Sequence, residues 1–111
     1  MIKKSKKKFL YGTWTGLNLV NHGPSTRLDL ELTLSDHQEN LLINCRFTGV
    51  SGLEIGNLEL YRGLALEVKK IVGDWADGLK FDIVEIEHEV LLFKCVAVDI
   101  TEDDLKAGEI K

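Results

Sequence analysis

The side chains that could carry chemistry are scattered along this chain. Its three histidines, His22, His37 and His88, lie far apart, and its two cysteines are also widely separated. Because the ligands of a preformed zinc site usually lie two to five residues apart, this spacing argues against a bound metal. The run Gly49–Gly52 contains a serine but lacks the Gly-x-Ser-x-Gly spacing of a nucleophile elbow. We therefore predict a protein that is not an enzyme and that has no catalytic residue, metal or cofactor.

The two cysteines are expected to be structural. Cys45 and Cys95 both fall on apolar strand faces, where burial raises the pKa of a thiol and keeps it unreactive. The segment that follows the basic start, FLYGTWTGLNLV, is too polar for a secretory signal, and no apolar run is long enough to cross a bilayer. We therefore expect a cytoplasmic protein with reduced thiols. A disulfide between the two cysteines stays an alternative in an oxidising compartment.

Acidic residues gather in the last third of the chain. Between Asp74 and Asp104 there are ten acids and two lysines. Three glutamates alternate in sequence and should share the solvent face of a strand, and a tryptophan lies between two aspartates in a turn, where it could anchor a basic partner. The predicted partner-binding residues are Asp74, Trp75, Asp77, Asp82, Glu85, Glu87 and Glu89.

The basic residues are distributed differently. The chain has 14 lysines and arginines against 18 acids, for a net charge of −4, and five of the lysines fall in residues 1–8. Nucleic-acid binding requires basic groups spread over a folded face, whereas a terminal run is usually flexible. We therefore expect no nucleic-acid or membrane partner. The acidic body should instead attract a cationic protein, faster at low salt.

Alternation of apolar and polar residues predicts the elements. From Arg27 to Ser35 every second residue is leucine, and residues 41–48 alternate after a short polar loop, which together predict an antiparallel hairpin. Further strands are expected over 10–20, 79–87 and 90–100, with a turn at Val50–Gly52. Residues 58–72 fit either a helix or a strand; we favour a strand over 64–72 after a one-turn lead-in, because Gly63 disfavours a helix.

The whole pattern predicts an all-β protein. With 111 residues, 44% of them hydrophobic, the chain suits one domain. We expect a single-domain antiparallel β-sandwich or partly open barrel of about seven strands, with one short helix allowed after Thr101. The expected organisation is a flexible basic segment over 1–8, a β domain over 9–104 and a tail over 105–111.

Two family resemblances follow from short motifs. The run Gly12-Thr13-Trp14-Thr15-Gly16 resembles the opening of calycin barrels such as lipocalins. That resemblance implies a barrel that binds an apolar small molecule in an internal cavity of roughly several hundred Å³, closed at one end by Trp14.

The second resemblance covers residues 41–100. The blocks Arg46–Val50, Gly78–Ile83 and Phe93–Val98, in this order, are similar to small bacterial β-proteins of the immunity protein 50 type, which are found beside polymorphic toxins. This resemblance implies a bacterial protein that neutralises a toxin by direct contact. Together with the acidic residues, it leads us to predict a basic, nuclease-type toxin as the partner.

Overall fold

The computed structural model describes residues 2–24, 26–73 and 78–105. These residues form eight strands and one 3₁₀ turn, which confirms the predicted all-β class. The elements are β1 (Lys3–Ser5), β2 (Phe9–Val20), β3 (Leu28–Asp36), β4 (Leu41–Ile55), η1 (Leu58–Leu60), β5 (Gly63–Lys70), β6 (Phe81–Glu85), β7 (Leu91–Cys95) and β8 (Ala97–Asp104). Within the described ranges, no helix is long and apolar enough to cross a membrane.

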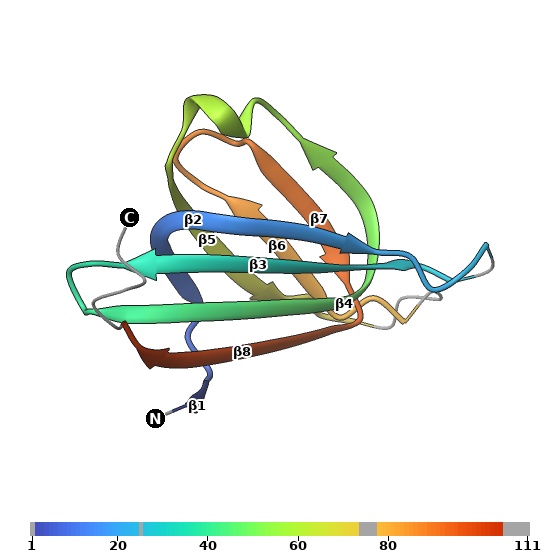
Figure 1. The fold of residues 1–111 in the computed structure, drawn as a ribbon. Coiled ribbons are helices and arrows are strands. Elements are labelled where there is room, and N and C mark those ends of the chain that lie inside the picture. The colour runs from blue at the N-terminus through green and yellow to red at the C-terminus, as the bar shows by residue number, and fades with distance from the viewer. Residues whose placement is uncertain (1, 25, 74–77, 106–111) are drawn as a thin grey trace.

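Six of the strands close into an antiparallel barrel. The order β4–β3–β2–β5–β6–β7 returns to β4, because β7 pairs with the second half of that long strand. Strand β8 pairs with the first half of β4, and β1 adds to the outer edge of β8. In Figure 1, β2, β3, β4 and β8 form the layer nearest the viewer, and β5, β6 and β7 lie behind it. The two layers enclose one apolar core.

The predicted leucine hairpin is confirmed and supplies much of that core. Leu30, Leu32 and Leu34 all point into the barrel, and they face Phe47, Cys45 and Ile43 across the β3–β4 ladder. Full burial of an aliphatic side chain contributes about 1.5–3 kcal/mol relative to its exposure. Seventeen buried residues form one cluster, against which Trp14 and Tyr61 also pack.

Strand β4 continues where the sequence analysis predicted a turn. Gly49 has a φ of +68° and forms a bulge, so that the strand bends instead of reversing. Val96, opposite this bulge, donates its N–H to the Thr48 carbonyl at 2.9 Å. The bend lets β4 change partners from β8 to β7. It also divides the single strand expected over 90–100 into β7 and β8.

Replacing Gly49 by alanine should lower the free energy of unfolding by about 1–3 kcal/mol. A β-carbon at this position would lie 2.8 Å from Val96 Cγ2, in addition to the cost of the positive φ. The matched control is Gly52→Ala, because Gly52 has a φ of +65° and open space around it. Urea unfolding should show a larger loss of unfolding free energy for Gly49→Ala than for Gly52→Ala. Equal losses of free energy would exclude a contribution from the Val96 contact.

Strand pairing extends toward both ends of the described chain. Residues expected to form a flexible basic segment include β1, whose three residues pair with β8, and Lys7, whose ammonium lies 2.7 Å from the Glu102 carboxylate. The helical turn allowed after Thr101 is absent from the described residues, because β8 runs on to Asp104 along β4. The ladder hydrogen bonds to β4 outweigh the weak local preference for a capped turn. Within residues 58–72 the chain forms η1 and then β5, so the favoured strand is present and ends at Lys70.

Candidate functional site

Strand β6 has the opposite phase to the one predicted. Ile83 and Glu85 point into the barrel, and Val84 and Ile86 point outward. Glu85 is fully buried, so its expected place beside Glu87 and Glu89 on a solvent face is wrong, and it cannot touch a partner directly. The phase is inverted because apolar residues occur on both faces of this short strand, and the local pattern does not distinguish them.

The Glu85 carboxylate is bound by backbone N–H groups. Ala65 donates at 3.1 Å, Glu87 at 3.2 Å and His88 at 2.7 Å. Burial by itself would raise the pKa of Glu85, but these bonds, with a further one from Val90, favour the carboxylate and lower its pKa overall. Glu85 therefore fastens the β6–β7 turn to β5 as an anion.

An aromatic stack holds the same turn from its other side. The rings of Tyr61 and His88 lie 3.9 Å apart between centroids and are nearly parallel, at 13°. Tyr61 follows η1, and its carbonyl accepts a hydrogen bond from the Trp14 indole at 2.9 Å. The β6–β7 turn and η1 are thus joined at one end of the barrel, with Glu87 and Glu89 exposed on the turn.

The outer surface of β5, β6 and β7 carries a row of side chains that continues onto its neighbours. The ladder registers align Phe9, Glu67, Val84, Leu92 and Glu54 across five strands. A second row contains Tyr11, Ala65 and Ile86. Tyr11 pairs with Ala65, and the Ala65 carbonyl accepts a hydrogen bond from the N–H of Ile86. We call this surface, with the adjoining turn, the β5–β7 face. It consists of Phe9, Tyr11, Glu54, Glu67, Val84, Ile86, Glu87, Glu89 and Leu92.

Large apolar side chains on the β5–β7 face are open to solvent. Phe9 is 60% exposed, Tyr11 52%, Ile86 48% and Leu92 37%. A groove next to Leu92 is lined by Glu54, Ile55, Gly56, Val84, Glu89, Leu91 and Leu92. Exposed apolar side chains that gather beside polar ones mark a surface for protein contacts.

The carboxylates on this face differ in how they are neutralised. Within the described part of the chain, Glu54, Glu87 and Glu89 have no cationic partner. Asp82, beside this set of residues, lies on the outer side of β6, and its carboxylate is 3.5 Å from the Lys94 ammonium. Asp74, Trp75 and Asp77 lie outside the described residues. Of the seven predicted partner-binding residues, Glu87 and Glu89 are thus exposed, and neither has a cationic partner in the described ranges.

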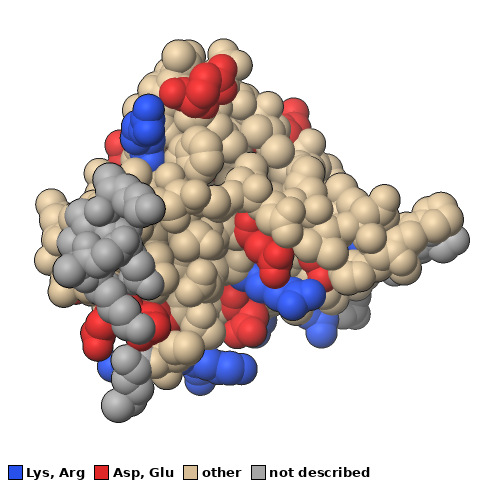
Figure 2. All heavy atoms as spheres, in the orientation of Figure 1, with Lys and Arg blue, Asp and Glu red and all other residues tan. Residues whose placement is uncertain are grey.

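The acids of β8 lie elsewhere. The Asp99 carboxylate is 3.9 Å from the Lys4 ammonium, and Glu102 is bound by Lys7. Asp99 also follows Glu31 and Arg46 in register across β3, β4 and β8. Figure 2 shows this alternation of acidic and basic side chains on the face toward the viewer, and further acidic side chains at the end where η1 lies. The acids from Asp82 to Asp104, which the structure describes, therefore do not form one surface.

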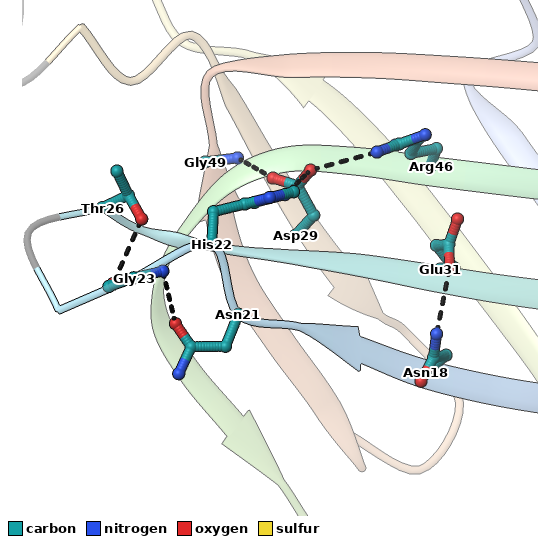
Figure 3. Close-up of polar contacts among 9 residues, drawn as sticks. All are labelled: Asn18, Asn21, His22, Gly23, Thr26, Asp29, Glu31, Arg46 and Gly49. Carbon is teal, nitrogen blue, oxygen red and sulfur yellow. Dashed lines mark hydrogen bonds and ion pairs between the residues drawn. The ribbon is translucent and has the colours of Figure 1, made fainter.

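Sequence reasoning missed a cluster around Asp29. This carboxylate is buried at the bulge of β4, where it accepts the N–H of Gly49 at 3.1 Å. His22 Nε2 lies 2.9 Å from it and an Arg46 guanidinium nitrogen lies 3.4 Å from it. In Figure 3 both side chains point toward the Asp29 carboxylate. Burial opposes ionisation, but the bonds from His22, Gly49 and Arg46 outweigh it and lower the pKa of Asp29. The cluster joins the β2–β3 connection to β4.

The signal for this cluster in the sequence was weak. Its side chains come from three segments, 7 and 17 residues away from Asp29 in the sequence. Asp29 also occupies a polar position in the alternation of β3, and that position predicts a side chain that faces solvent. The Asp29 side chain is buried because the bulge at Gly49 folds over it. The glycine at position 49 was the one feature of the sequence that could have indicated this bulge.

Potential metal ligands and both thiols of the chain lie within the described ranges. There, no three residues among His, Cys, Asp and Glu are placed to hold a metal ion. Cys45 and Cys95 are both buried and not bonded to each other. Burial raises the pKa of each thiol to about 12. At neutral pH they are therefore protonated core residues.

Comparison with known proteins decides between the two resemblances. The family model of Immunity protein PIM8 matches residues 4–100, from β1 into β8. No curated protein and no solved structure matches the chain. The resemblance to bacterial immunity proteins is confirmed, with PIM8 as the family in place of the immunity protein 50 type. The chain belongs to the Immunity protein PIM8 family, and its function is immunity against a toxin.

Proposed function

We propose that this protein neutralises its cognate toxin by direct contact through the β5–β7 face, in the cytoplasm, and without catalysis. The observation that carries the proposal is a juxtaposition on one face. Exposed Phe9, Tyr11, Ile86 and Leu92 lie beside the carboxylates of Glu54, Glu87 and Glu89, which have no cationic partner among the described residues. Apolar side chains supply most of the binding energy of an interface, and charges at its rim set orientation and association rate.

We further propose that the toxin surface is basic and of the nuclease type. A nuclease binds phosphates with lysines and arginines, and carboxylates can occupy the same groups. The fixed β6–β7 turn supports this role, since Glu85 and the Tyr61–His88 stack hold Glu87 and Glu89 in place before binding. A preordered surface loses less conformational entropy on association.

Charge reversal at the turn tests the electrostatic part of the proposal. Glu89→Lys should slow association with the cognate toxin domain by about tenfold at low salt, and the difference should shrink as salt rises. The matched control is Glu39→Lys, because Glu39 is equally exposed but lies in the β3–β4 turn. Stopped-flow kinetics would measure both. Equal rates for the two variants would contradict a basic partner at this face.

A further inference from the structure

An apolar pocket edged by lysines lies at the end of the barrel away from η1. It has a volume of about 270 Å³ and is lined by Ser5, Lys6, Lys7, Lys8, Val68, Lys70, Phe81, Val98 and Ile100. Residues 5–8 cross there from β8 to β5: Ser5 pairs with Ile100, and Val68 donates its N–H to the Lys8 carbonyl at 2.7 Å. The pocket is therefore bounded by a segment that connects two strands of the fold.

The floor of the pocket is part of the barrel interior. Val68, Phe81 and Val98 are partly buried and pack against the core, and Ile100 is buried. They are accessible because β8 pairs with β4 and β1 and leaves a gap toward β5 and β6. An apolar group that enters this gap would continue the core packing.

Several ammonium groups lie at the rim of the pocket. Lys7 is neutralised by Glu102, with 2.7 Å between ammonium and carboxylate. Lys6, Lys8 and Lys70 have no carboxylate partner among the residues that the structure describes. In a chain of net charge −4, three lysines around one opening, without a carboxylate partner in the described ranges, are a local exception.

We propose that this pocket binds a small anionic amphiphile, a carboxylate or sulfate on a short alkyl chain. The tail would lie on Val68, Phe81 and Val98, and the anionic head would contact Lys6, Lys8 or Lys70. Each methylene removed from water adds affinity, and the ammonium groups favour an anion over a neutral head. The site is separate from the β5–β7 face, so it does not depend on the proposed mode of toxin binding.

Titration of the full chain with sodium octanoate tests the proposal. At low salt, calorimetry should detect one site, and the amide NMR signals of Val68, Phe81 and Val98 should shift. Octanol, which lacks the charge, and acetate, which lacks the tail, should each bind at least about threefold more weakly. Octyl sulfate in place of octanoate distinguishes a general anion site from one selective for carboxylate.

Variants separate the rim from overall charge. The double variant Lys8→Gln, Lys70→Gln should weaken octanoate binding by about threefold or more. Lys3→Gln, Lys94→Gln changes the net charge equally but lies off the pocket, and should bind as the natural chain does. The proposal fails if both variants bind octanoate alike, if octanol or acetate binds as well as octanoate, or if the shifted amides lie elsewhere.

Discussion

Replacing Glu85 by glutamine should lower the free energy of unfolding at pH 7 by about 2–4 kcal/mol. The substitution keeps the size of the side chain but replaces one acceptor oxygen with an NH₂ group, which faces backbone N–H donors. Hydrogen bonds to a charged acceptor each contribute about 1.5–3 kcal/mol, and a buried donor that loses its acceptor costs a similar amount. Urea unfolding at pH 7 measures the difference.

The same variant should show a characteristic dependence on pH. Because the pKa of Glu85 is lowered in the folded protein, its contribution to stability is complete above the ordinary glutamate pKa of 4.5. That contribution is lost as pH falls from this value through the folded pKa. The stability gap between the natural chain and Glu85→Gln should therefore narrow below pH 4.5. The pKa of Asp29 is also lowered. Because Asp29 is present in both proteins, its contribution cancels in the difference between their stabilities.

An exposed neighbour provides the control for Glu85. Glu87→Gln removes the same charge two residues further on, from a side chain that is exposed on the turn. We expect it to change stability by less than about 0.5 kcal/mol, with no trend at acidic pH. If Glu85→Gln also changed stability by so little and showed no trend at acidic pH, the Glu85 carboxylate would not be what fastens the β6–β7 turn to β5.

Replacing Tyr11 by alanine should weaken binding of the cognate toxin domain by about 10–100-fold. A tyrosine at the centre of an interface typically contributes 2 kcal/mol or more, of which each 1.4 kcal/mol is a factor of about ten in affinity. Since the side chain is 52% exposed in the free protein, the substitution should leave the free energy of unfolding nearly unchanged. Calorimetric titration and urea unfolding would measure the two quantities.

The control for Tyr11 lies on the same strand. Leu19 is 44% exposed and is paired with Leu30 at the far end of β2, away from the β5–β7 face. Leu19→Ala should therefore bind the toxin domain with unchanged affinity. A loss of affinity at Leu19 with none at Tyr11 would move the interface away from the β5–β7 face and leave the immunity function itself intact.

Local alternation in the sequence was sufficient to predict the all-β class and the β3–β4 hairpin. In Leu28–Leu34 leucine recurs at every second position, and a period of two places all of them on one side of a strand whatever the strand packs against. The one-turn lead-in and β5 also followed from local signals, since Gly63 disfavours a continuing helix. These features depend on neighbours within a few residues.

Closure of the barrel, the burial of Glu85 and the cluster at Asp29 were decided by the tertiary structure. Around β6, either Phe81 and Ile83 or Val84 and Ile86 could face the core, because both pairs are apolar. The register with β5 and β7 places Phe81 and Ile83 toward the core. With that phase set, Glu85 turns inward and is stabilised by N–H groups from β5 and the β6–β7 turn. Likewise, Lys3–Ser5 forms a strand because it pairs with the outer edge of β8. Each outcome depends on contacts between segments distant in sequence, which a local pattern does not encode.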